Sequence, residues 1–175
     1  VRMLVECLRC VVDSSASISL YHTLASVLFN TETQLLADLA SQAKRQHKTL
    51  ETILEGQTDE LYKSLQIAVK TIQEWRAESG SISVGKLVYK IIDQTGYKEV
   101  LSRLALDDPE AAHSIMQLSE FFKTLKEFES IALQPTTIQY LESFPVLEAA
   151  GDSNEDGTLE VTDDKISVLT IHKAK

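Results

Sequence analysis

The sequence predicts a mainly α-helical protein that ends in one short β-strand. Apolar residues recur three or four positions apart through roughly residues 1–150, which is the spacing of amphipathic helices. The closing segment ISVLTIHKAK instead groups β-branched and apolar side chains closely, which is typical of a strand. Since a single strand is not stable alone, we expect further sequence, or loose self-association, to supply the rest of its sheet.

About seven to eight helices are expected, and turn residues mark several of their ends. Thr31 would cap one helix, with Gln34 three residues later completing a capping box. Asp108 and Pro109 would open another, and Pro145 would bend or stop the last one. The apolar spacing places helical segments at 1–13, 18–29, 31–44, 49–55, 59–78, 84–96, 97–104, 108–128 and from the end of QPTT to about residue 151.

Two apolar stripes are predicted to face the core. A chain of 175 residues with 43% apolar composition is long enough to enclose one. The first stripe consists of Leu61, Leu65, Ala68, Ile72 and Trp75, and the second of Ile115, Leu118, Phe122 and Leu125.

Composition excludes several classes of protein. No apolar run approaches the roughly 18 to 20 residues that cross a bilayer, and the start does not resemble a secretory signal, so we expect a cytoplasmic protein without a membrane partner. Cys7 and Cys10 form one C-x-x-C inside a helical pattern. Zinc would require more ligands, so packed and inert thiols are predicted.

The net charge of −9 is unevenly distributed. Residues 1–104 carry 12 basic and 12 acidic side chains, whereas residues 105–164 carry 2 and 14. The last segment, 165–175, carries 3 basic side chains and no acidic ones. Because an acidic block repels a polyanion, any contact with phosphate is expected in the first part or in the tail.

Motifs of a complete active site are missing from the sequence. There is no G-x-x-x-x-G-K-[ST], no G-x-G-x-x-G, no H-E-x-x-H and no G-x-S-x-G. The four histidines are scattered through different predicted elements. We therefore expect no cofactor in this chain and no ATP hydrolysis by the chain alone.

The acidic stretch DSNEDGTLEVTD matches the loop of a helix-loop-helix calcium site. The ligand positions are Asp152, Asn154, Asp156, Thr158, Glu160 and Asp163. Against calcium stand the short aspartate at the last position, the strand pattern after it and the lack of a second loop. A solvated hinge over residues 151–164 is the preferred interpretation.

The end of the sequence resembles the fifth motif of UvrD/Rep-type superfamily 1A DNA helicases, an apolar strand followed by T-x-H-x-x-K-G-L-E. Thr170, His172 and Lys175 match that pattern. Residues 1–30 look like the opening of the family's helical 2B insertion, although DSSAS departs from it.

This resemblance implies a division into three parts. Residues 1–150 would be a helical accessory, 2B-like subdomain, 151–164 a hinge, and 165–175 the start of a strand of the RecA-like domain 2A. The whole helicase would use ATP and magnesium in DNA unwinding and repair, while 2B regulates unwinding and contacts duplex DNA or partner proteins. Thr170 and His172 would approach the backbone of single-stranded DNA.

A basic cluster in AKRQHK is the candidate for duplex contact. Lys44, Arg45 and Lys48 stand beside His47 near a predicted helix end. Cations at that position also complement the negative end of the helix dipole, so both interpretations stay open. Lys86, Lys90 and Lys98 could add a second small group.

The competing hypothesis is a standalone helical protein-interaction module with a calcium-binding acidic loop. A coding sequence that continues from Lys175 with Gly-Leu-Glu would favour the helicase hypothesis. An unrelated continuation would remove its main support.

Overall fold

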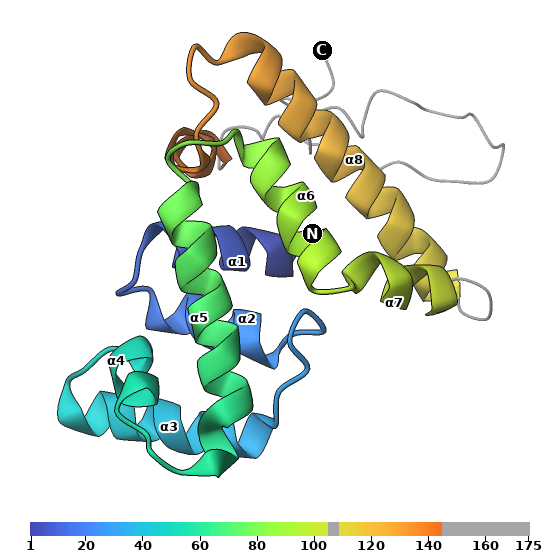
Figure 1. Ribbon diagram of the computed structural model, residues 1–175. Helices are drawn as coiled ribbons and strands as arrows, with labels where there is room; N and C mark the ends of the chain where they lie inside the picture. The colour runs from blue at the N-terminus through green and yellow to red at the C-terminus, as the bar shows by residue number, and fades with distance from the viewer. Residues whose placement is uncertain (105–108, 145–175) are drawn as a thin grey trace, which may run out of the picture. The chain divides into compact units, whose positions relative to one another are not determined.

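The computed structural model describes residues 1–104 and 109–144. These residues are mainly helical and include no β-strand, which confirms the predicted fold class for this part (Figure 1). The helices are α1 (Arg2–Val12), α2 (Ser17–Ala25), α3 (Thr33–Gln46), α4 (Leu50–Glu55), the 3-10 turn η1 (Glu60–Tyr62), α5 (Lys63–Glu78), α6 (Val84–Gln94), α7 (Tyr97–Leu104) and α8 (Pro109–Ile131). Residues 137–144 are also helical.

The chain divides into two compact units, Val1–Glu142 and Ser143–Lys175. Nearly all of the described residues belong to the first unit. The expected acidic hinge, terminal strand and bend at Pro145 lie outside the described residues.

Helices α1 to α5 pack on one another. Helix α2 contacts α1, α3 and α4, and α5 contacts α1 and α4. In the later part of the unit, α6 and α8 run side by side and α7 contacts both (Figure 1). The fully buried Trp75 joins the two groups, because its Nε1 donates to Gln94 Oε1 on α6 at 2.6 Å. Burying one large apolar side chain of this kind stabilises a fold by roughly 1.5–3 kcal/mol.

Arg76 ties the C-terminal end of α1 to α5. Its Nε donates to the carbonyl oxygen of Val11 at 3.1 Å, and its Nη2 donates to that of Cys10 at 2.8 Å. These carbonyls belong to the last turn of α1, whose final carbonyls have no partner within the helix. A side chain 65 residues away in sequence therefore completes the hydrogen bonding of this helix end.

The N-terminus of α6 is held by the segment around α8. The Val84 amide donates to the Pro135 carbonyl at 2.9 Å, and the Gly85 amide donates to Glu129 Oε1 at 2.8 Å. A carboxylate at a helix N-terminus satisfies free amides and interacts favourably with the helix dipole. This contact fixes α8 beside α6.

Two predicted helix ends were wrong. Helix α3 begins at Thr33 after Glu32, with no side-chain cap, and Thr31 does not form the capping box with Gln34. Instead, the Thr31 hydroxyl donates to the Leu24 carbonyl at 2.6 Å, at the end of α2. Helix α2 ends at Ala25 rather than near residue 29, because Ser26 turns extended there.

The predicted core stripes hold only in part. Leu65, Ala68, Ile72 and Trp75 are buried, but Leu61 is 56% exposed because it lies in η1 before α5 begins. On α8, Leu125 is buried as predicted, whereas Ile115 is 39% exposed. Phe121 is buried, and Leu118 and Phe122 are only half-buried.

Candidate nucleic-acid interface

The cationic corner, defined as Lys44, Arg45 and Lys48, lies where α3 ends. The left-handed backbone of His47, with φ 51°, turns the chain there. The Lys48 amide donates to the Ala43 carbonyl at 3.1 Å, and the His47 amide to the Lys44 carbonyl at 3.4 Å. These two bonds make a Schellman turn, which satisfies carbonyls at a helix C-terminus.

The start of α4 fixes the other side of this turn. Thr49 is the N-cap of α4, and its hydroxyl oxygen accepts a hydrogen bond from the Thr52 amide at 3.2 Å. The Leu50 amide donates to Ser17 Oγ at 3.0 Å, which connects the turn to α2. The cationic corner therefore stands on a short connection held at both ends.

All three side chains of the cationic corner are exposed. None of the ion pairs among residues 1–104 and 109–144 uses them. Their charges are thus open to solvent and to an anionic partner. Lys44 and Arg45 also lie in the last turn of α3, where cations interact favourably with the helix dipole.

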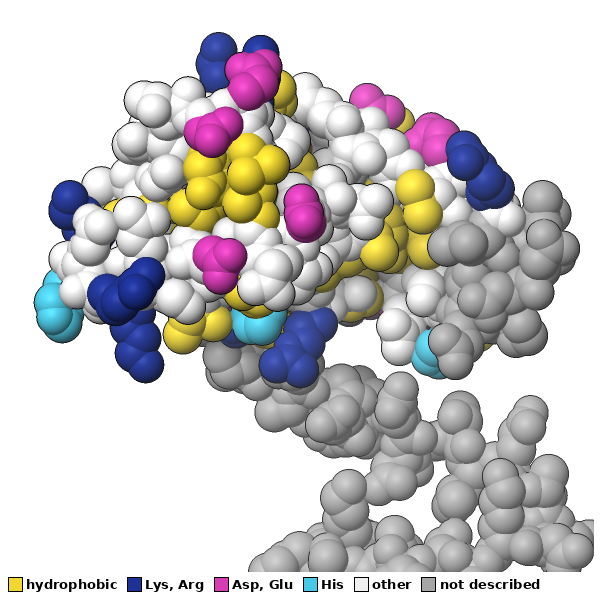
Figure 2. Space-filling model, turned by 90° about the horizontal axis from the view of Figure 1, so that it is seen from below, with side chains coloured by type: hydrophobic (Ala, Val, Ile, Leu, Met, Phe, Trp, Pro, Cys, Tyr) yellow, Lys and Arg dark blue, Asp and Glu magenta, His cyan; other side chains and the backbone are white. Residues whose placement is uncertain are grey.

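The wider surface is electrostatically mixed. On the face shown in Figure 2, the Lys and Arg side chains of the described residues stand singly or in small groups, with acidic side chains among them. Strong duplex binding depends on many cationic contacts with phosphates. The cationic corner alone can supply at most three.

A groove borders the cationic corner. Its volume is about 290 Å³, and it lies between α2 and α3 beside the start of α4. It is lined by Ser17, Ile18, Tyr21, Ala40, Ala43, Lys44, Lys48 and Leu50. The residues of its apolar part were not predicted as a site, although alanines three positions apart on a helix leave room on one face.

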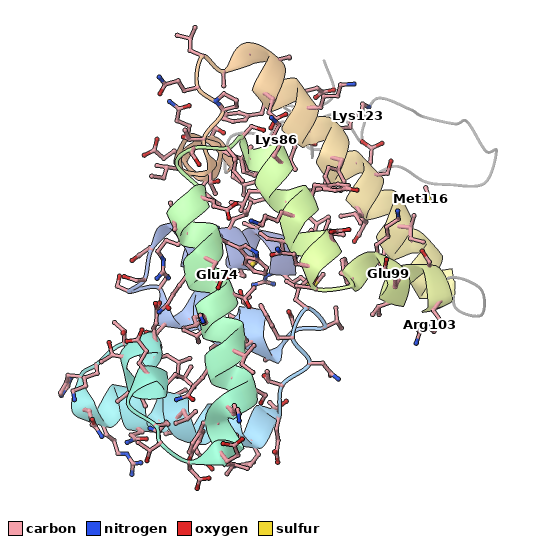
Figure 3. The ribbon with its side chains drawn as sticks, viewed as in Figure 1. Glu74, Lys86, Glu99, Arg103, Met116 and Lys123 are labelled. Carbon is pink, nitrogen blue, oxygen red and sulfur yellow. The ribbon has the colours of Figure 1, made fainter. Side chains whose placement is uncertain are left out.

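The second predicted basic group is not assembled as expected. Lys90 forms an ion pair with Glu78, with Nζ 2.6 Å from Oε1, so the charge of Lys90 is already neutralised. Lys86 is exposed on the first turn of α6, and Lys98 is exposed on α7 (Figure 3 labels Lys86). This group is therefore reduced to two separate lysines.

The remaining predicted site residues lie outside the described part of the chain. These are Thr170 and His172 for single-stranded DNA, and the calcium ligands Asp152, Asn154, Asp156, Thr158, Glu160 and Asp163. Within residues 1–104 and 109–144, no group of three or more His, Cys, Asp or Glu side chains could hold a metal ion.

Cys7 and Cys10 are free and buried, which confirms that they are packed. The Cys10 thiol donates to the Cys7 carbonyl at 3.2 Å. The neighbouring Cys10 thiol and burial together raise the pKa of Cys7 well above its ordinary value. A high thiol pKa leaves little reactive thiolate.

Among the helices of the described residues, none combines the length and apolar character needed to cross a membrane.

Fold and surface together define a helical domain with an exposed cationic corner beside an apolar groove. No protein-family model matches the chain. The chain is similar to an ATP-dependent helicase/nuclease subunit of Bacillus mycoides (strain KBAB4), at 22% identity over 183 aligned residues that cover 100% of this chain and 14% of that protein. The protein of the same name from Bacillus cereus (strain G9842) is 21% identical over the same coverage. That of Ligilactobacillus salivarius (strain UCC118) is 22% identical over 115 residues, which cover 66% of this chain and 9% of that protein.

The chain thus spans about 14% of the length of the first of these curated relatives. The similarity supports a distant relationship to helicase-type enzymes.

Proposed function

We propose that the chain acts as a helical accessory subdomain of an ATP-dependent DNA helicase that takes part in DNA unwinding and repair. The observation that carries this proposal is the similarity of the whole chain to helicase/nuclease proteins. The helical fold of the described residues is compatible with it. ATP and magnesium would be bound by other domains of the larger protein.

Two DNA contacts belong to the proposal. The cationic corner would hold phosphates of duplex DNA near the point of unwinding, because its three cations are exposed and unpaired within the described residues. Thr170 and His172 would donate hydrogen bonds to the backbone of the single strand. The acidic segment 151–164 would serve as a hinge between the subdomain and the motor.

Equilibrium binding to a fluorescein-labelled forked DNA tests the duplex contact. Fluorescence anisotropy over a series of salt concentrations gives the affinity and its salt dependence. We expect weak binding that falls steeply with salt, and a triple variant, Lys44→Ala with Arg45→Ala and Lys48→Ala, whose log–log salt slope is smaller by about 2 to 3.

A matched control removes the same charge elsewhere. Lys63, Lys70 and Lys86 are also exposed, so replacing all three by alanine changes the net charge equally. This control variant should bind forked DNA nearly as the parent chain does. An equal loss in both variants, or no loss in either, would exclude the cationic corner as a duplex site.

Binding to labelled oligo(dT) tests the single-strand contact separately. We expect the Thr170→Ala and His172→Ala variants to bind the oligonucleotide more weakly, each by about two- to tenfold, with the binding of duplex DNA unchanged. Unchanged oligo(dT) affinity in both variants would remove these residues from the proposal.

A further inference from the structure

The groove between α2 and α3 has a floor that a phosphate backbone cannot use. Ile18 and Tyr21 of α2 face Ala40 and Ala43 of α3 across it, and Leu50 lies at its end. Ile18 is 76% exposed, so a large apolar side chain stands at the edge of the groove without cover in the described structure. Covering such a surface with another apolar side chain is favourable by roughly 25 cal/mol per Å².

The size of the groove restricts its occupant. Its volume of about 290 Å³ lies at the lower limit of small-molecule pockets, which are about 300–1,000 Å³. One or two side chains of a peptide suit such a volume better than a large cofactor does. The one polar side chain of the floor, Ser17, already accepts the Leu50 amide through its Oγ.

The rim of the groove has the opposite character to its floor. Lys44 and Lys48 line it, and neither belongs to an ion pair of the described residues. Arg45 belongs to the same corner but does not line the groove. Charge complementarity therefore selects acidic groups placed on either side of an apolar anchor.

We propose that the groove between α2 and α3 is a docking site for an acidic protein segment that carries a bulky apolar side chain. The apolar side chain would enter between Ile18 and Ala40, and flanking carboxylates would pair with Lys44 and Lys48. This proposal depends on the groove alone and not on the DNA contact proposed above. Because the two lysines are shared, bound peptide and bound duplex DNA should compete.

Synthetic peptides test the proposal by fluorescence anisotropy. The probe is a labelled Glu-rich peptide of about twelve residues, roughly three helical turns, with Leu and Phe at its centre. Two control peptides replace Leu and Phe by Ser, or the Glu residues by Lys. Only the first peptide should bind measurably, and binding of either control at equal affinity would overturn the proposal.

Variants of the protein distinguish the floor from the charges. Ala40→Trp fills the groove and should weaken the acidic peptide by about tenfold or more. Ser41→Trp places the same indole on an exposed position of α3 outside the groove and should leave peptide affinity within about twofold. Ile18→Ser changes an exposed position, so it should remain folded and also weaken the peptide by about tenfold.

The same variants separate this proposal from the DNA contact. Arg45→Ala should weaken forked DNA and leave the acidic peptide unchanged, whereas Ile18→Ser should do the reverse. If no variant of the floor affects the peptide, or if Ile18→Ser weakens forked DNA but not the peptide, the groove is not a peptide site. Loss of DNA binding on Arg45→Ala with unchanged peptide binding would leave both proposals standing.

Discussion

Arg76 on α5 and Glu51 on α4 form a two-pronged ion pair, with Nη1 2.7 Å from Oε1 and Nη2 2.9 Å from Oε2. The Glu51 side chain is 10% exposed and that of Arg76 24%. Gln73 donates a further hydrogen bond to Glu51 Oε1 at 2.8 Å. Together with the bonds from Arg76 to the end of α1, this pair joins α1, α4 and α5.

Arg76→Ala should destabilise the fold by about 2–4 kcal/mol, because it leaves a largely buried carboxylate and two helix-end carbonyls without their donor. Urea unfolding followed by circular dichroism measures the loss. Lys63→Ala is the control, since it breaks only the exposed pair with Glu60 and should cost no more than about 0.5 kcal/mol. Equal effects of the two substitutions would contradict the structural role of Arg76.

Stability should fall on acidification through Glu51. Burial opposes the ionisation of this side chain, but hydrogen bonds from Arg76 and Gln73 and the guanidinium charge outweigh it and lower the pKa of Glu51 below its ordinary value of 4.5. The stabilisation is therefore complete above the pKa of the unfolded chain and is lost as pH falls through the lower pKa of the folded chain. Glu51→Gln should be less stable at neutral pH and show a smaller loss below about pH 4.5. Parallel pH profiles of the two proteins would show that Glu51 does not contribute.

The contact between Gly85 and Glu129 should appear in a double-mutant cycle. A Cβ at position 85 would lie 2.8 Å from Glu129 Oε1, so Gly85→Ala must displace the carboxylate that holds the start of α6. Glu129→Ala alone should cost about 1 kcal/mol. With alanine at 129, Gly85→Ala should become neutral or stabilising by up to about 1 kcal/mol, because alanine favours the helix. Additive effects would show that the two residues are not coupled.

Cys7 and Cys10 should resist modification while the protein is folded. Both are buried, and the pKa of Cys7 is raised, so the thiolate is scarce and inaccessible. With Ellman's reagent in mildly alkaline buffer, both thiols should react about 100-fold or more slowly than in urea-unfolded chain. A thiol that reacts at the unfolded rate in the folded protein would contradict this burial.

Helix positions were predictable from sequence because they depend on neighbouring residues. The apolar spacing of α5 and the glycine at 56 that ends α4 are local signals. Thr31 was misread because its hydroxyl bonds to Leu24 in the preceding turn rather than to its own helix. Local sequence does not reveal that competition.

The candidate site was predictable only in its charges. The exposure of Lys44, Arg45 and Lys48 followed from their position at a helix end. The neutralisation of Lys90 depends on Glu78 of another helix, and the groove depends on how α2 packs against α3. Such pairings arise from tertiary structure, and so no spacing in the sequence indicates them.

The coding sequence on both sides of residues 1–175 tests the central claim most directly. If this chain is part of a helicase, the reading frame will continue after Lys175 with Gly-Leu-Glu, and the sequence before Val1 will contain a glycine-rich phosphate loop that ends in Gly-Lys-Ser or Gly-Lys-Thr. A stop codon at that point, or flanking sequence without either motif, would contradict the helicase assignment.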